Sequence, residues 1–186
     1  MDVVSILLIG AGLSMDAFAV SVCKGLALGE RYRLSHSLKA GAYFGFFQAL
    51  MPLLGYCLGS AFSEYVEKYS PFLSFALLAF VGGKMLYEAI KWDGEERNAD
   101  MDVKTMLLLA LATSIDAFAV GVALAMQDAL IFPSVALIGV TTFIFSLVGV
   151  KIGNLFGAGH NRAATAVGGT ILFGLGVRFL ISGIIG

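Results

Sequence analysis

Two aspartates lie inside long apolar stretches of the sequence. Asp16 falls in the middle of residues 3–23, and Asp116 falls in the middle of residues 105–126. An ionised carboxyl group at the centre of a membrane helix costs about 2.5–3.5 kcal/mol on insertion scales. Two such groups in one chain favour a function, because paired carboxylates bind cations and exchange protons. The alternative is a protonated aspartate that only forms a hydrogen bond between helices.

The two aspartates belong to two copies of one motif. Residues 14–22 read SMDAFAVSV and residues 114–122 read SIDAFAVGV, so seven of nine positions are identical. Weaker matches follow in each half of the chain. They pair Gly41, Phe47, Gln48, Gly55 and Gly59 with Gly139, Phe145, Ser146, Gly153 and Gly157, and Gly82 and Lys84 with Gly176 and Arg178. The sequence therefore predicts one repeat over residues 1–90 and a second over residues 105–186, joined by a polar connection at residues 91–104.

Neutral oxygen atoms accompany the aspartates. Thr113 lies three residues before the second aspartate, and so on the same helix face. Ser14 and Ser114 come two residues before each aspartate, about 200° around a helix, and they reach the same site only if the helix is irregular. Gln48 and Ser146 hold equivalent places in the second and fifth apolar stretches. Each hydroxyl is a candidate ligand or, alternatively, part of an interhelical hydrogen bond.

The expected site is rich in oxygen and poor in softer ligands. No His or Cys lies close to either aspartate in the sequence. Two carboxylates with neutral oxygens suit Mg²⁺, Ca²⁺ or Mn²⁺. Lys84 and Arg178 are the basic residues that could pair with the aspartates or gate them. The alternative is that their long side chains extend to the membrane surface.

The composition is that of a membrane protein. Hydrophobic residues make up 59% of the chain and charged residues 13%, against about 45–50% and about 25% in soluble domains. Six stretches have about the length that a membrane-spanning helix needs; they are residues 3–23, 38–59, 71–90, 105–126, 131–153 and 164–185. The sequence therefore predicts an all-α, polytopic membrane protein of six helices. It has no basic tail to suggest a nucleic-acid partner.

Lysine and arginine gather on one side of the predicted bundle. The first, third and fifth connections, with the helix ends next to them, hold ten of these residues, and the other side holds Lys68 and Arg178. Cytoplasmic loops carry the excess of basic residues, so both termini are predicted to lie outside the cytoplasm. Each repeat has an odd number of spans, so the second repeat enters the membrane from the opposite side. Inverted repeats of this kind place a substrate site near the midplane, between the halves.

Three segments resemble the MntP-type manganese efflux pumps of bacteria: the two motifs above and FGFFQALMPLLG at residues 44–55. The resemblance extends over essentially the whole chain. It implies export of Mn²⁺ across the bacterial cytoplasmic membrane, with Asp16 and Asp116 as essential motif residues. Gln48 departs from those members that carry a glutamate at this place, so the site of this chain has one negative charge fewer.

We therefore expect the protein to be a secondary transporter. The chain has no phosphate-binding Gly-x-x-x-x-Gly-Lys-[Ser/Thr] loop, so proton antiport is the predicted energy source. The expected partners are the lipid bilayer, Mn²⁺ as transported substrate and protons, with no resident cofactor and no enzymatic activity. The alternatives are an exporter of another divalent cation, or of a small solute such as an amino acid as in the wider LysE-like exporters. An intramembrane aspartyl protease is a remote alternative, because its Gly-x-Gly-Asp motif is missing here.

Overall fold

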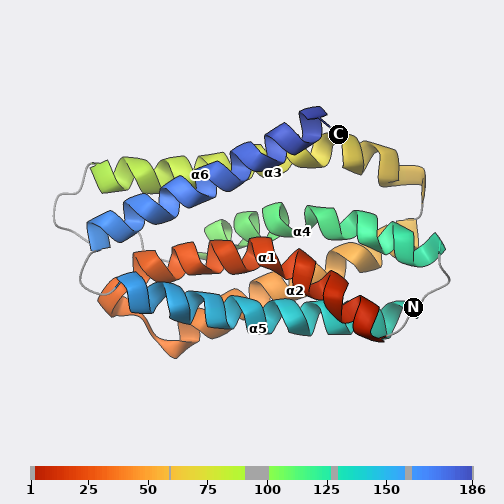
Figure 1. The fold of residues 1–186 in the computed structure, drawn as a ribbon, viewed down its shortest axis with the longest axis horizontal. Helices are drawn as coiled ribbons and strands as arrows, with labels where there is room; N and C mark the ends of the chain where they lie inside the picture. Colours follow the sequence, from red (N-terminus) through yellow and green to blue (C-terminus); the bar gives the residue numbers. More distant parts are fainter. Residues whose placement is uncertain (1–2, 59, 91–100, 127–129, 158–160, 186) are drawn as a thin grey trace.

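The computed structural model describes residues 3–58, 60–90, 101–126, 130–157 and 161–185, and this part of the chain is helical throughout apart from short turns. The elements in chain order are α1 (Val3–Leu28), the short 3₁₀ helix η1 (Gly29–Arg31), α2 (Leu34–Leu58), α3 (Ser60–Ile90), α4 (Val103–Met126), α5 (Ile131–Gly157) and α6 (Asn161–Ile185). Six long helices lie along one bundle (Figure 1). The predicted all-α fold class of six helices is confirmed.

Most of the helices are long and apolar enough to cross a membrane. Among the described residues, five contain such a segment, and the apolar part of α3, Pro71–Tyr87, is shorter. The predicted third span began at residue 71, whereas α3 begins at Ser60. The difference arises because the first turns of α3 are polar, and a hydropathy pattern detects only the apolar part of a helix.

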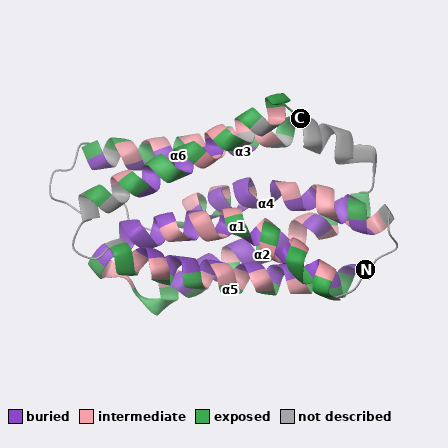
Figure 2. Ribbon diagram, in the orientation of Figure 1, coloured by how far each residue is buried: buried purple, intermediate pink, exposed green. Residues whose placement is uncertain are grey.

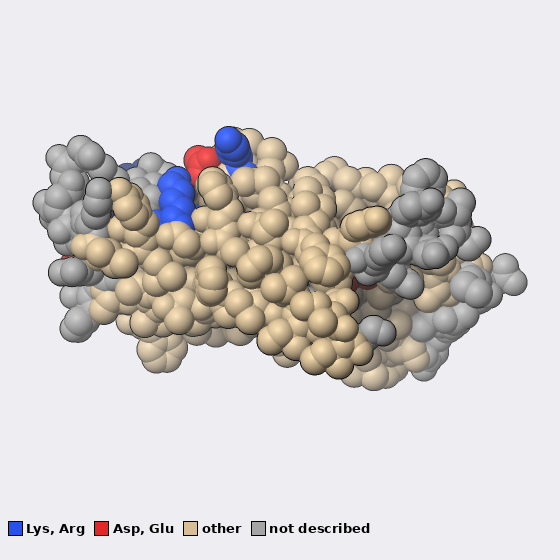
Figure 3. All heavy atoms as spheres, turned by 90° about the horizontal axis from the view of Figure 1, so that it is seen from above, with Lys and Arg blue, Asp and Glu red and all other residues tan. Residues whose placement is uncertain are grey.

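The outer surface of the bundle is apolar. Large side chains such as Phe80, Phe132 and Phe156 are more than 60% exposed, and few charged side chains appear on the described surface over α3 and α6 (Figure 3). A soluble protein does not expose apolar area on this scale. The chain is therefore a multi-pass membrane protein whose apolar side chains face lipid.

The two helices that carry the aspartates form the centre of the bundle. In Figure 1, α1 and α4 lie between the pair α3 and α6 and the pair α2 and α5. Helix α1 packs on α5, α6 and α4, and helix α4 packs on α2, α3 and α1. Buried residues concentrate on these central helices (Figure 2). The set of packing partners is unchanged when α1 is exchanged with α4, α2 with α5 and α3 with α6. Two related halves would produce this pattern; the inverted repeat and its boundaries stay predictions.

Glycines bring neighbouring helix backbones into direct contact. A methyl group built on Gly55 of α2 would collide with the carbonyl oxygen of Phe118 in α4. One built on Gly153 of α5 would collide with the carbonyl oxygen of Val22 in α1. Small residues permit this close approach in membrane helices. Since Phe118 and Val22 lie within two turns of the aspartates, these contacts also fix where the two carboxyl groups lie.

Candidate cation site

The two aspartates face the interior from adjacent central helices. Helices α1 and α4 are in contact, and the two carboxyl groups lie close enough to repel each other electrostatically. The side chain of Asp16 is 15% exposed. Atom Oδ1 of Asp116 is buried and has no hydrogen-bond partner among the described residues. A pair of carboxyl groups kept together away from water favours binding of a cation between them.

Arg178 of α6 reaches the first aspartate. Its Nη1 atom lies 3.5 Å from Oδ1 of Asp16, and its own side chain is 74% exposed. The sequence left two possibilities for this residue, pairing or extension to the membrane surface. In the structure the guanidinium group is exposed and makes the ion pair as well.

Lys84, the predicted counterpart of Arg178, lies elsewhere. It is an exposed residue of α3, and its charge acts on Asp102, just before α4. A hydrogen bond from Thr105, opposed by partial burial and aided by the charges of Lys24 and Lys84, lowers the pKa of Asp102. The structure therefore places Lys84 beside the start of α4, and its predicted role in gating stays a prediction.

A polar junction joins α1, α2 and α5 just before Asp16. The Ser14 hydroxyl donates to the Gly10 carbonyl oxygen at 2.6 Å, and its oxygen lies 2.8 Å from Oγ1 of Thr142. Atom Nε2 of Gln48 lies 3.4 Å from the carbonyl oxygen of Leu13. This contact leaves Oε1 of Gln48 buried without a hydrogen-bond partner. The amide is thus held by its nitrogen, and its oxygen can accept a bond from a proton or a cation.

The two hydroxyls that precede Asp116 bond to their own helix. Thr113 donates to the Leu109 carbonyl oxygen at 3.0 Å, and Ser114 donates to the Ala110 carbonyl oxygen at 2.7 Å. Both side chains are buried. Their protons are used, but each oxygen keeps a free lone pair. Both hydroxyl groups therefore have a hydrogen-bond partner within α4. The roles of Thr113 and Ser114 as metal ligands stay predictions.

Ser146 of α5 differs from these hydroxyls. Its oxygen is buried with no hydrogen-bond partner. The preceding residue, Phe145, packs edge-on against Phe18 of α1, with ring centroids 6.2 Å apart. Ser146 therefore follows a residue of α5 that contacts α1 at Phe18, two residues after Asp16. Its predicted role as a ligand remains open to test.

Buried acceptor atoms without partners are a shared feature of this region. Among the described residues these are Ser21 Oγ, Gln48 Oε1, Asp116 Oδ1 and Ser146 Oγ. Buried polar atoms are nearly always hydrogen-bonded, so each exception needs an explanation. A bound cation is one such explanation for those oxygens that lie beside the aspartates. No cluster of three or more His, Cys, Asp or Glu residues occurs in the described ranges, so such a site has two carboxylates and otherwise neutral oxygens.

Sequence reasoning missed Thr142 and Ser21. The repeat comparison paired Gln48 with Ser146, two positions that both carry a buried, unsatisfied oxygen. Moving that comparison by one helical turn pairs Gly45 with Gly139 and places Gln48 opposite Thr142. This second register was a signal available in the sequence, and the contact between the hydroxyl groups of Thr142 and Ser14 gives it structural meaning.

The fold and this site define a class of protein. Several membrane-crossing helices around interior carboxylates and neutral oxygens are characteristic of ion transporters, in which charged residues inside the membrane mark the ion pathway. The chain belongs to the MntP family, described as "Putative manganese efflux pump", whose family model matches residues 31–180.

Curated relatives resemble the chain over nearly their whole length. A protein of Mannheimia succiniciproducens is 47% identical, with 97% of each chain covered. One of Acetivibrio thermocellus is 44% identical, with 97% of this chain and 91% of the relative covered. One of Methanosarcina mazei is 44% identical, with 93% and 92% covered. Each of the three carries the name "Putative manganese efflux pump MntP". No solved structure matches the chain.

Proposed function

We propose that this protein exports Mn²⁺ across the cytoplasmic membrane as a secondary transporter. The observation that carries the proposal is the pair of aspartates on adjacent central helices, together with buried oxygens without partners on α1, α2, α4 and α5, helices that pack against one another. Divalent manganese prefers carboxylate, carbonyl and water oxygens. The names of the relatives supply the choice of manganese over magnesium or calcium.

In the proposed site, some residues supply negative charge and others supply neutral oxygen ligands. Asp16 and Asp116 supply the two negative charges that balance a divalent cation. Gln48 supplies a neutral oxygen, oriented because its nitrogen lies against the Leu13 carbonyl group. Ser146 offers a second neutral oxygen. A site with few charges and mixed ligands binds its cargo loosely enough to release it, as transport requires.

Arg178 serves as a tethered cation in this mechanism. Without metal, it neutralises part of the charge of Asp16 across 3.5 Å. An incoming Mn²⁺ would compete for the same carboxylate, and the guanidinium group, whose side chain is 74% exposed, would then separate from Asp16. The ion pair thus stabilises the empty site and weakens metal binding by the free energy of the pair.

Export needs a source of free energy. Moving one charge against a potential of 100 mV requires about 2.3 kcal/mol, so a divalent cation requires about 4.6 kcal/mol. The two aspartates are the groups that could release protons when the metal binds and take them up when it leaves. This exchange would couple Mn²⁺ export to the entry of protons.

Inside-out membrane vesicles test the proposal. Export then becomes uptake of Mn²⁺, and an acidic lumen is expected to accelerate it, since protons leave as the metal enters. The expected result is gradient-driven uptake by the wild type, none by Asp16→Asn or Asp116→Asn, and uptake near the wild-type rate by Asp102→Asn, a matched control outside the bundle interior. Excess Mg²⁺ or Ca²⁺ tests selectivity in the same assay. Uptake that ignores the pH gradient would contradict proton coupling, and full uptake by either aspartate variant would contradict the site.

A further inference from the structure

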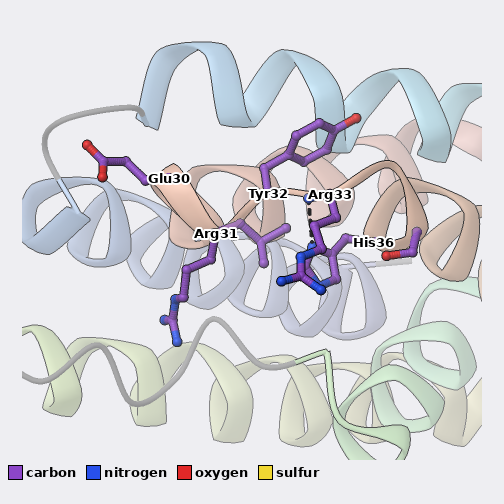
Figure 4. A pocket seen from close by; sticks show the side chains of 7 residues that line it. Glu30, Arg31, Tyr32, Arg33 and His36 are labelled. Carbon is purple, nitrogen blue, oxygen red and sulfur yellow. Dashed lines mark hydrogen bonds between the residues drawn. The ribbon is translucent and has the colours of Figure 1, made fainter.

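A polar pocket lies at the connection between α1 and α2, away from the paired aspartates. It has a volume of about 470 Å³ and is lined by Glu30, Arg31, Tyr32, Arg33, Ser35 and His36. Figure 4 shows Arg31 and Arg33 extending to the same side of the connection, with Glu30 directed away from both. Two guanidinium groups that share one side of a pocket favour an anion with several oxygens, because each group offers a fork of N–H donors.

Contacts with α5 and with the start of α2 hold the connection around the pocket in shape. Gly29 has a φ of 50°, which favours glycine, and its carbonyl oxygen accepts a hydrogen bond from the side chain of Asn154 in α5. The hydroxyl groups of Tyr32 and Ser37 lie 3.0 Å apart. A preformed pocket loses little conformational entropy when it binds a ligand.

His36 fixes the start of α2 next to the pocket. The Arg33 backbone N–H donates to Nδ1 of His36 at 3.1 Å, and the His36 N–H donates to the Arg33 carbonyl oxygen at 2.9 Å. The His36 side chain therefore caps the Arg33 N–H from the third helical position, as the third residue of a capping box does, and the second bond is between backbone groups. Because Nδ1 accepts a hydrogen bond, the ring proton of neutral His36 sits on Nε2, which is a donor.

The surface beside the pocket is apolar. Leu34 is 61% exposed and Leu38 is 46% exposed, one turn apart on α2. A soluble anion gains nothing from such a surface, whereas the acyl chains of a lipid would pack on it. Basic pockets at the ends of membrane helices are suited to phosphate headgroups in the adjoining leaflet.

We propose that this pocket binds the phosphate group of an anionic phospholipid, with Arg31 and Arg33 contacting the phosphate and Leu34 and Leu38 contacting the acyl chains. Such a lipid would bind at the connection whose basic residues predict a cytoplasmic location. The pocket shares no lining residue with the proposed cation site, and the proposal does not depend on the identity of the transported ion.

Native mass spectrometry of the purified full-length protein tests the proposal. The probes are phosphatidylglycerol, phosphatidylcholine with the same acyl chains, and inorganic phosphate. The variant is R31Q/R33Q, and K104Q/K151Q is the control that removes the same charge from exposed positions outside the pocket. Phosphatidylglycerol should bind R31Q/R33Q about thirty-fold more weakly than the wild type, the effect of two basic residues at a membrane surface. The control should change by less than about three-fold.

The three probes separate the outcomes. Preference for phosphatidylglycerol over phosphatidylcholine that is lost in R31Q/R33Q supports the lipid site. Arginine-dependent binding of inorganic phosphate that displaces the lipid supports the phosphate chemistry but overturns the lipid as its source. Equal binding of phosphatidylglycerol by R31Q/R33Q and K104Q/K151Q overturns the proposal. Circular dichroism of each variant confirms that it is folded.

Discussion

At the residue scale, the ion pair between Arg178 and Asp16 would compete with metal at the proposed site. The Arg178→Gln variant should therefore bind Mn²⁺ more tightly, since the metal no longer displaces a cation. Solvent-exposed ion pairs contribute about 0.2–1 kcal/mol, and Asp16 is only 15% exposed, so the expected gain in affinity is on the order of five-fold. Titration of the purified protein with Mn²⁺ measures it, and Arg178→Lys is the control that keeps the charge.

Weaker binding by the Arg178→Gln variant would contradict this account. Arg178 would then orient Asp16 for the metal instead of competing with it. The two roles predict opposite changes in Mn²⁺ affinity, so one titration separates them.

The repeated motif made Asp16 and Asp116 the candidate site residues, because a carboxyl group is rare in an apolar stretch and a repeated one is rarer. The partners of these residues could not be predicted in the same way. Whether Arg178 reaches Asp16 depends on how far α6 is displaced along α1, and Lys84 at the corresponding place in α3 lies near Asp102 instead. Tertiary packing sets such displacements, and a local pattern carries no information about them.

At the element scale, direct backbone contact between α1 and α5 depends on Gly153. The Gly153→Ala variant places a methyl group against the Val22 carbonyl oxygen, and forcing extra volume into packed positions costs about 1–3 kcal/mol. Its thermal unfolding midpoint in detergent, followed by circular dichroism, should fall below that of the wild type. Gly174→Ala is the matched control in α6, because a methyl group there meets nothing within 4 Å. Equal midpoints for the two variants would show that the close approach is not required.

Asp102 immediately precedes α4, the helix that carries Asp116. Its Oδ2 accepts a hydrogen bond from the Thr105 N–H at 3.1 Å. Asp102→Ala should destabilise the protein by about 1 kcal/mol, the usual cost of losing such a cap, whereas Asp102→Asn keeps the cap. Thermal unfolding of the two variants at neutral pH provides the measurement. Equal loss in both would indicate that the charge matters and the cap does not.

The cap also has a pH dependence of known sign. Since folding lowers the pKa of Asp102, its ionised form stabilises the folded state. That stabilisation is complete above the ordinary carboxyl pKa of about 4 and is lost as the pH falls through the lower folded value. The wild type should therefore lose this increment on acidification, and Asp102→Asn should not.

Hydropathy predicted six helices and their order, because apolar stretches of membrane length have few other structures available to them. It underestimated the length of α3, which includes polar residues before Pro71. It also could not predict that α1 and α4 form the centre. That arrangement follows from which faces carry glycine and alanine, such as Gly55 and Gly153, and these residues select partners only once the helices are side by side.

At the scale of the whole molecule, the arrangement of the bundle explains why the site is interior. The two aspartate-bearing helices are covered on one side by α3 and α6 and on the other by α2 and α5 (Figure 1). Helix α1 begins and α6 ends toward the same end of the bundle, as an even number of spans requires. The side of the membrane on which that end lies remains a prediction from the distribution of lysine and arginine.

The central claim is that Asp16 and Asp116 together hold one Mn²⁺ ion. Electron paramagnetic resonance tests it most directly, because the signal of free Mn²⁺ decreases when the purified protein binds the ion. The account predicts one bound ion for each wild-type chain. It predicts affinity at least about ten-fold weaker in Asp16→Asn and in Asp116→Asn, since loss of even an outer-shell partner has that effect, and no change in Asp102→Asn. Wild-type affinity in either aspartate variant would contradict it.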